Sequence, residues 1–181
     1  NPDFPDPWKY LWIDAWNGGD GCITHVDPVD NNTVYFSMQN GATRRKDLSA
    51  DESISIRPQP PGEVKDSLRY NFVGPYIISP HNSKTLYQAG NFVFKTTNRG
   101  DDWKMISGDL SISSMPEKKS VAAGTIAESP IKPGTLYVGT DKGACWISKN
   151  DGKSWSEISS GLANAYIRSI TPSKYKAGRV Y

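Results

Sequence analysis

The sequence predicts an all-β protein, and three observations carry that prediction. The 181-residue chain contains 16 glycines and 13 prolines, spaced at fairly regular intervals like the turns between many short strands. No segment shows the apolar periodicity of an amphipathic helix. Finally, a motif ending in tyrosine recurs every 44 to 52 residues, at Tyr35, Tyr87, Tyr137 and Tyr181. One blade of a β-propeller has this length, so we expect four-stranded antiparallel blades.

The repeat also predicts how the chain is divided. A proline lies seven residues before the tyrosine in the first three copies and nine residues before it in the fourth. About three and a half blades are therefore expected, in six segments. These are residues 1–17, the end of a preceding blade or a linker; 18–60, a blade with a degenerate turn motif; 61–109, a blade with the complete motif; 110–123, a solvated excursion between blades; 124–160, a second blade with the complete motif; and 161–181, the start of a further blade.

Individual strands follow from the turn signals inside each repeat. In the second repeat we expect strands at residues 73–79, 85–89, 92–96 and 103–106, and in the third at 125–129, 135–140, 144–149 and 154–158. Pro-Gly, Lys-Gly and Asp-Gly turns separate the strands of the third repeat. The first repeat has no tryptophan after its basic stretch 44–46, so its last hairpin must close differently.

A turn motif with a hydroxyl side chain, Asn, Gly and Trp at fixed offsets occurs twice. Its residues are Thr96, Asn98, Gly100 and Trp103 in one copy and Ser148, Asn150, Gly152 and Trp155 in the other. Hydroxyl and amide side chains bond nearby backbone groups, Gly supplies a positive φ, and Trp covers the blade. The pattern resembles the Asp-box, or BNR repeat, with Asn in place of the commoner Asp. We expect these eight residues to be structural and to lie between the outer strands of a blade.

Further segments resemble large secreted bacterial propeller proteins described as glycosyl-hydrolase-like or sortilin N-terminal-domain-like. In chain order they are 18–21, 25–28, 35–41, 53–58, 69–72, 78–82 and 127–134. The resemblance implies an extracellular, cell-surface or periplasmic protein with two packed propellers. Three and a half blades do not close a ring, so we expect a fragment of a larger protein, or closure by another chain. The expected partners are other protein chains or the rest of the same propeller.

Loops that lead into the innermost strands form the expected binding surface, at one end of the propeller channel. The candidates are Gly19, Asp20 and Gly21 in the first blade, Arg69 and Asn71 in the second, Lys119 and Ser120 in the third, and Tyr166 and Arg168 in the fourth. Glycines around Asp20 would let a ligand approach closely. The alternative is that this Gly-rich stretch is simply a turn.

Glycoside hydrolysis requires two carboxyl groups about 5 to 9.5 Å apart. Asp20 is one candidate, and Glu128 is placed in an inner strand where it is either paired or directed between blades. Sialidase-type chemistry would need an arginine cluster and a tyrosine nucleophile, for which Arg69, Arg168 and Tyr166 are the right residue types. No carboxylate pair stands out within the chain. The sortilin-like resemblance implies a protein-interaction scaffold, and we predict a non-catalytic binding or assembly module that mediates protein–protein interaction. The alternative is a propeller that binds or hydrolyses extracellular glycan.

Composition excludes several other classes. The net charge of +2 is too small to indicate a nucleic-acid partner, and no apolar run approaches the roughly 18 residues of a membrane-spanning helix. Cys22 and Cys145 are too few and too far apart for a zinc or disulfide framework. Cys22 and His25 are an odd number of residues apart, so they face opposite sides of a strand. Phosphate-loop, dinucleotide and serine-hydrolase motifs are missing as well. The sequence therefore predicts no cofactor and no metal.

Overall fold

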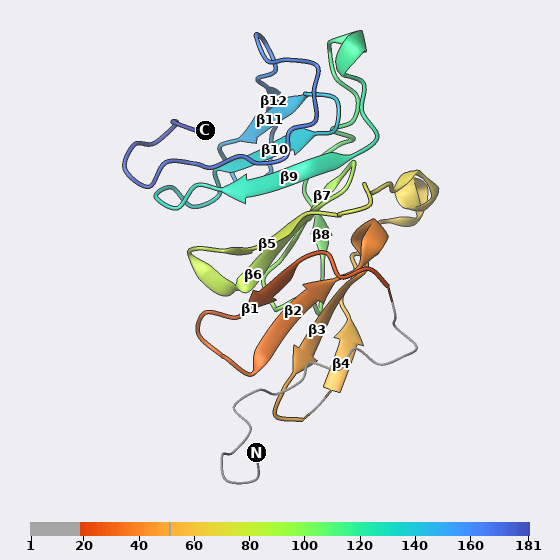
Figure 1. Cartoon of the computed structure of the whole chain (residues 1–181), viewed down its shortest axis with the longest axis vertical. Helices are drawn as coiled ribbons and strands as arrows, with labels where there is room; N and C mark the ends of the chain where they lie inside the picture. Colours follow the sequence, from red (N-terminus) through yellow and green to blue (C-terminus); the bar gives the residue numbers. More distant parts are fainter. Residues whose placement is uncertain (1–18, 51) are drawn as a thin grey trace.

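A computed structural model describes residues 19–50 and 52–181, and the predicted segment 1–17 lies outside them. The described residues form three antiparallel sheets of four strands, and within each sheet the strands follow chain order. The sheets lie one after another along the long axis of the molecule (Figure 1). The first sheet contains β1 (Thr24–Val26), β2 (Thr33–Ser37), β3 (Thr43–Asp47) and β4 (Glu52–Ser55). The predicted all-β fold with four-stranded antiparallel units is confirmed.

The other two sheets follow the strands expected from the repeat, with shorter outer strands. The second contains β5 (Tyr76–Ser79), β6 (Asn82–Ala89), β7 (Val93–Thr96) and β8 (Lys104–Met105). The third contains β9 (Ala123–Glu128), β10 (Leu136–Thr140), β11 (Cys145–Ser148) and β12 (Ser156–Glu157). Short 3-10 turns lie at Gln39–Gly41, Gly62–Ser67 and Pro116–Lys118. Among the described residues, no helix is both long and apolar enough to cross a membrane.

Two apolar cores hold the sheets together face to face. Tyr35 of the first sheet packs with Tyr76 and Leu86 of the second, and all three are at most 2% exposed. The second core joins residues such as Val93 and Val138, both fully buried, across the next junction. Strand β9 contacts both β5 and β6, so the second and third sheets come together at the edge that holds these strands. Since sheets twist, sheets that converge at one edge separate toward the other.

Each complete turn motif contacts the sheet before it. Trp103 donates its indole N–H to the carbonyl of Ile56 at 2.7 Å, and Trp155 donates to the carbonyl of Ile106 at 2.8 Å. The glycine of the same turn lies against the same isoleucine: a Cβ added to Gly152 would meet Cδ1 and Cβ of Ile106 at 2.6 and 2.7 Å. These interlocking contacts meet at the end of β8: the N–H of Ile106 bonds the carbonyl of Val93 in its own sheet at 2.8 Å, while its carbonyl accepts from Trp155 of the next sheet.

The excursion between the second and third sheets is more firmly attached than its composition predicts. Lys118 is only 2% exposed, and its ammonium group donates to the carbonyls of Leu162 and Ala163 at 2.9 and 3.1 Å. Partial burial disfavours ionisation of Glu157 in β12, but hydrogen bonds from Ser113, Ser114 and Ser159 outweigh it and lower its pKa to about 2. Ser113, Ser114 and Lys118 thus anchor the excursion to the third blade and the loop after it, while the solvated character expected of the segment as a whole stays a prediction.

Candidate functional site

The predicted channel-end loops are held by one recurring hydrogen bond. In each sheet, a side chain from the turn between the second and third strands accepts the backbone N–H of the segment that leads into the first strand. The pairs are Asp20 N–H with Gln39 Oε1 at 2.9 Å, Arg69 N–H with Asn91 Oδ1 at 2.7 Å, and Val121 N–H with Asp141 Oδ1 at 3.1 Å. The sequence repeat did not reveal this contact, because Gln, Asn and Asp share only an acceptor oxygen.

Arg69, the first basic candidate at this end, is occupied by contacts within the chain. Its guanidinium donates to the carbonyls of Ser67 and Val121, at 2.9 and 3.4 Å. It also lies 3.0 Å from Asp109 and donates to the hydroxyl of Ser111 at 2.9 Å. Partial burial disfavours ionisation of Asp109, but the hydrogen bonds that it accepts from Ser111, from the side-chain amide of Asn91 and from Arg69 lower its pKa. This arginine therefore ties the excursion to the loop before β5.

Asn71 and the fourth-repeat candidates also contact neighbouring backbone. Asn71 donates from its amide to the carbonyls of Ala122 and Ala123, at 3.1 and 3.0 Å. The ring of Tyr166 lies close over Gly124, and the Arg168 guanidinium stacks 5.5 Å from that ring. Burial, followed by the charge of a nearby aspartate, raises the pKa of the Tyr166 hydroxyl, which disfavours its use as a nucleophile.

The two carboxylates considered for hydrolysis lie in different surroundings. Asp20, like its neighbours Gly19 and Gly21, is exposed, and its side chain makes no hydrogen bond or ion pair with another described residue. Glu128 is 7% exposed and accepts the backbone N–H of Gly134 at 2.8 Å. Its carboxylate also lies 3.5 Å from the Tyr87 hydroxyl of the preceding sheet. Glu128 is thus directed between sheets, one of the two placements expected for it.

The eight turn residues form two matching hydrogen-bonded loops between the last two strands of their sheets. Thr96 Oγ1 accepts the N–H of Gly100 at 3.1 Å, and Ser148 Oγ accepts that of Gly152 at 2.9 Å. Asn98 Oδ1 accepts the N–H of residue 102 at 3.0 Å, and Asn150 Oδ1 accepts that of residue 154 at 2.9 Å. The amide oxygen thus makes the contact a carboxylate would make.

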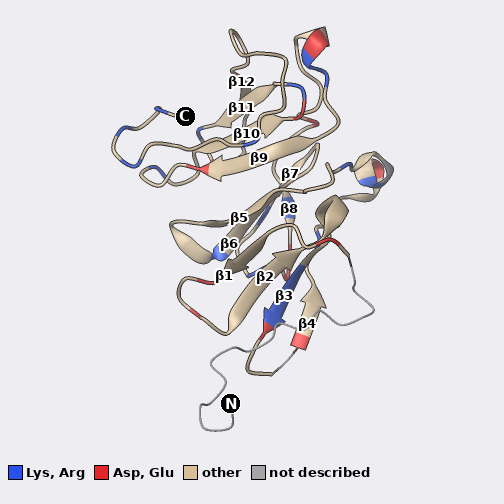
Figure 2. Ribbon diagram, viewed as in Figure 1, with Lys and Arg blue, Asp and Glu red and all other residues tan. Residues whose placement is uncertain are grey.

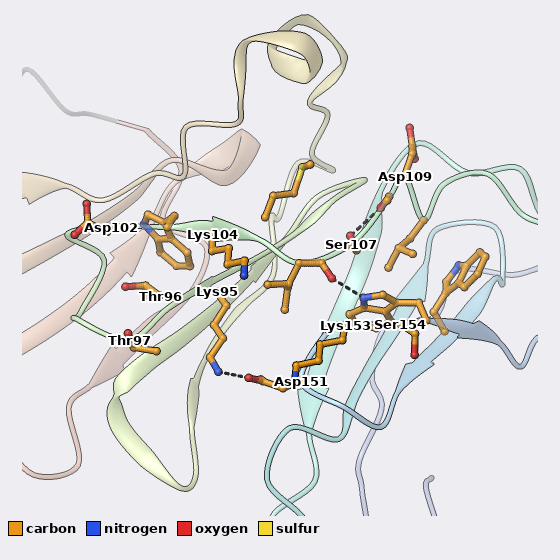
Figure 3. A pocket seen from close by; sticks show the side chains of 18 of the residues that line it. Lys95, Thr96, Thr97, Asp102, Lys104, Ser107, Asp109, Asp151, Lys153 and Ser154 are labelled. Carbon is orange, nitrogen blue, oxygen red and sulfur yellow. Dashed lines mark hydrogen bonds and ion pairs between the residues drawn. The ribbon is translucent and has the colours of Figure 1, made fainter.

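A hollow lies away from the channel-end loops, where the outer parts of the second and third sheets separate. This groove has a volume of about 1070 Å³ and is bounded by residues 95–98 and 102–110 on one side and by Trp146 and residues 151–155 on the other. Figure 3 shows Lys104 and Lys95 on the side of the second sheet, with Lys95 reaching across to Asp151. That ion pair has an Nζ–Oδ2 distance of 2.5 Å. The channel-end prediction did not include this groove, whose sides come from two different repeats.

The charges at this groove differ from those at the junction before it. Strand β3 carries three consecutive basic residues, drawn in blue in Figure 2, and its Arg45 crosses to Asp101 of the next sheet at 2.9 Å. By strand register, Arg45 lies opposite Ile54, whereas Lys95 lies opposite Lys104. Counting from the asparagine of each turn, the position of Asp101 is taken by Lys153 in the next copy. Lysines therefore stand at the second junction, Lys95, Lys104 and Lys153, where the first junction has Arg45, Ile54 and Asp101.

Comparison with known proteins places the chain in a fold class. No protein-family model matches it, and no curated protein matches it. Solved structures do. The GH74 xyloglucanase from Xanthomonas campestris superposes with a TM-score of 0.57 at 20% identity, over 79% of this chain and 21% of that one. YCF48 bound to D1 peptide gives 0.56 at 14% identity, over 86% and 44% of the two chains.

A third similar structure is the extracellular domain of a protein from B. thetaiotaomicron described as a one component system. Its TM-score is 0.55 at 17% identity, over 85% of this chain and 19% of that one. The chain thus spans less than half the length of each of these three structures. Identities this low show the fold alone. The chain is a β-propeller protein, in which each described sheet is one blade.

Proposed function

We propose that this chain is a non-catalytic propeller module of a secreted or cell-surface protein and that it binds a segment of another protein. The observation that carries the proposal is the open groove between the second and third blades, at about 1070 Å³. Pockets of this size hold ligands in proteins. The groove is bounded by Trp103, Trp146 and Trp155, and aromatic side chains of this kind are enriched in protein interfaces.

The occupied state of the channel-end side chains supports the same proposal. Arg69 and Asn71 are engaged by backbone and carboxylate partners, which leaves them few donors for a substrate. Similar propellers include one determined with a bound peptide and one that forms an extracellular domain. We also propose that the two turn motifs are Asp-boxes of the BNR type with a structural role, because their hydrogen bonds close each outer hairpin and contact the blade before it.

The test separates binding from hydrolysis. The chain is incubated with xyloglucan and other β-glucans while reducing ends are measured, and in parallel it is screened by fluorescence anisotropy against labelled linear peptides of varied charge. We expect saturable binding of a subset of peptides and no release of reducing ends. Release of sugar that is lost in Asp20→Asn would instead assign the chain to the glycoside hydrolases and refute the proposal.

A further inference from the structure

The groove between the second and third blades is lined by three lysines and three aspartates, and two of the lysines are not paired with any of these carboxylates. Lys95 and Lys104 lie directly opposite each other on neighbouring strands, an arrangement that brings their Cβ atoms to about 5 Å and disfavours like charges. Asp151 pairs with Lys95. Lys104 and Lys153 are exposed, and within the described part of the chain neither ammonium has a hydrogen-bonding or ion-pairing partner.

Of the aspartates that border the groove, two are already paired with cations other than Lys104 and Lys153. Asp109 is committed to Arg69, 3.0 Å away, and Asp151 to Lys95. Asp102 lies at one end of the groove (Figure 3), where its carboxylate accepts a hydrogen bond from the amide of Asn98 at 3.0 Å. Two unpaired ammonium groups thus face one carboxylate, and an anionic ligand would relieve the repulsion between Lys95 and Lys104.

The apolar lining and the free strand edge indicate the class of that ligand. Lys104 and Met105 are consecutive in β8 and so project to opposite faces of the sheet, yet both line the groove. The hollow therefore reaches the outer edge of β8, which pairs only with β7 among the strands of the described residues. An unpaired strand edge binds another extended backbone through main-chain hydrogen bonds, which a polysaccharide does not offer. The indole nitrogen of Trp146 is also buried, and no group of residues 19–50 or 52–181 forms a hydrogen bond with it.

We propose that the groove binds an extended acidic peptide segment of a partner protein. Its carboxylates pair with Lys104 and Lys153, its backbone lies along the free edge of β8, and its apolar side chains contact Trp155 and Met105. This inference rests on the proposed peptide-binding function and adds the place, the charge and the conformation of the ligand.

The experiment uses a labelled ten-residue peptide that alternates glutamate with valine, measured by fluorescence anisotropy against the unaltered chain. A matched peptide carries lysine in place of glutamate, and a third carries N-methyl groups on alternate backbone nitrogens. We expect the acidic peptide to bind at least tenfold more tightly than the basic one, to weaken as salt is raised, and to lose binding when it is N-methylated.

Variants assign the effect to the groove. Lys104→Gln and Lys153→Gln should each weaken the acidic peptide about threefold, as partly exposed ion pairs do, while Lys142→Gln, at an exposed turn on another part of the third blade, should not. The double variant Lys104→Glu with Lys153→Glu should reverse the preference toward the basic peptide. If peptide affinity is the same in these lysine variants as in the unaltered chain, the proposal that the groove binds an acidic peptide is overturned, while the proposed peptide-binding function stands.

Two other results have separate meanings. If no peptide of any charge binds, the proposed function fails together with this inference. If an oligogalacturonate binds in a manner dependent on Lys104 while the acidic peptide does not, the groove recognises an anionic glycan and the peptide assignment is refuted.

Discussion

The contact between the turn glycine and the preceding blade makes a quantitative prediction. Gly152 has φ of +81° and Gly161 has φ of +79°, so alanine at either position carries a similar backbone strain of about 1 to 2 kcal/mol. Their surroundings differ: a Cβ at Gly152 would meet Ile106 at 2.6 Å, whereas a Cβ at Gly161 would meet nothing within 4 Å. Overpacking of this kind adds about 1 to 3 kcal/mol.

We therefore expect Gly152→Ala to lower the free energy of unfolding by roughly 2 to 5 kcal/mol and Gly161→Ala by about 1 to 2 kcal/mol. Equilibrium urea unfolding followed by tryptophan fluorescence measures both. With a urea dependence of about 2 kcal/mol per molar, the midpoint of Gly152→Ala should lie about 1 M below that of Gly161→Ala. Equal midpoints for the two variants would refute the reasoning, because the backbone strain alone would then account for both losses.

Three other predictions concern separate contacts. Trp103→Phe removes the indole donor to Ile56 and should lower the unfolding free energy by about 1 to 2 kcal/mol, measured by thermal unfolding; an unchanged midpoint would mean that this bond contributes nothing. Asn91→Ala should lower the free energy of unfolding by about 2 to 4 kcal/mol, since Asn91 is fully buried and satisfies several hydrogen-bond partners. Gln39→Ala should lower it by under about 1 kcal/mol, because Gln39 is less buried. Similar losses for the two variants would contradict an effect of burial. The pKa of Glu157, lowered from 4.5 to about 2, means that its ionised form stabilises the fold above about pH 4.5 and that this contribution is lost as pH falls through 2. The stability advantage over Glu157→Gln should therefore shrink across that range in urea titrations, and a constant advantage would show that its charge is not involved.

The sequence predicted the fold well because its strongest signals are local. Turn residues and the buried tyrosine of each second strand repeat at fixed offsets, and the tyrosines at 35, 87 and 137 are all at most 2% exposed. Strand ends were less predictable. Ile106 was expected in a strand, but the tryptophan of the following repeat draws its carbonyl into the junction, and that contact spans 49 residues.

The candidate site was harder to predict because it also depends on contacts between residues far apart in the sequence. The residue type of Arg69 suggested a ligand contact, yet its guanidinium is used within the chain by Asp109 and by backbone carbonyls. The groove depends on how far two blades separate and on which charges face each other, and neither follows from one repeat alone.

The two junctions also differ in which sign of charge each blade presents to its neighbour. Arg99 follows the asparagine of the first turn and reaches Asp27 and Asp30 of the preceding blade, at 3.1 and 3.3 Å. Asp151 takes the same position in the second turn and reaches Lys95. Similar blades risk packing in the wrong order during folding, but packing the third blade on the first would set Asp151 against Asp27 and Asp30. The reversed charges thus disfavour that misassembly and favour the observed order of the three blades.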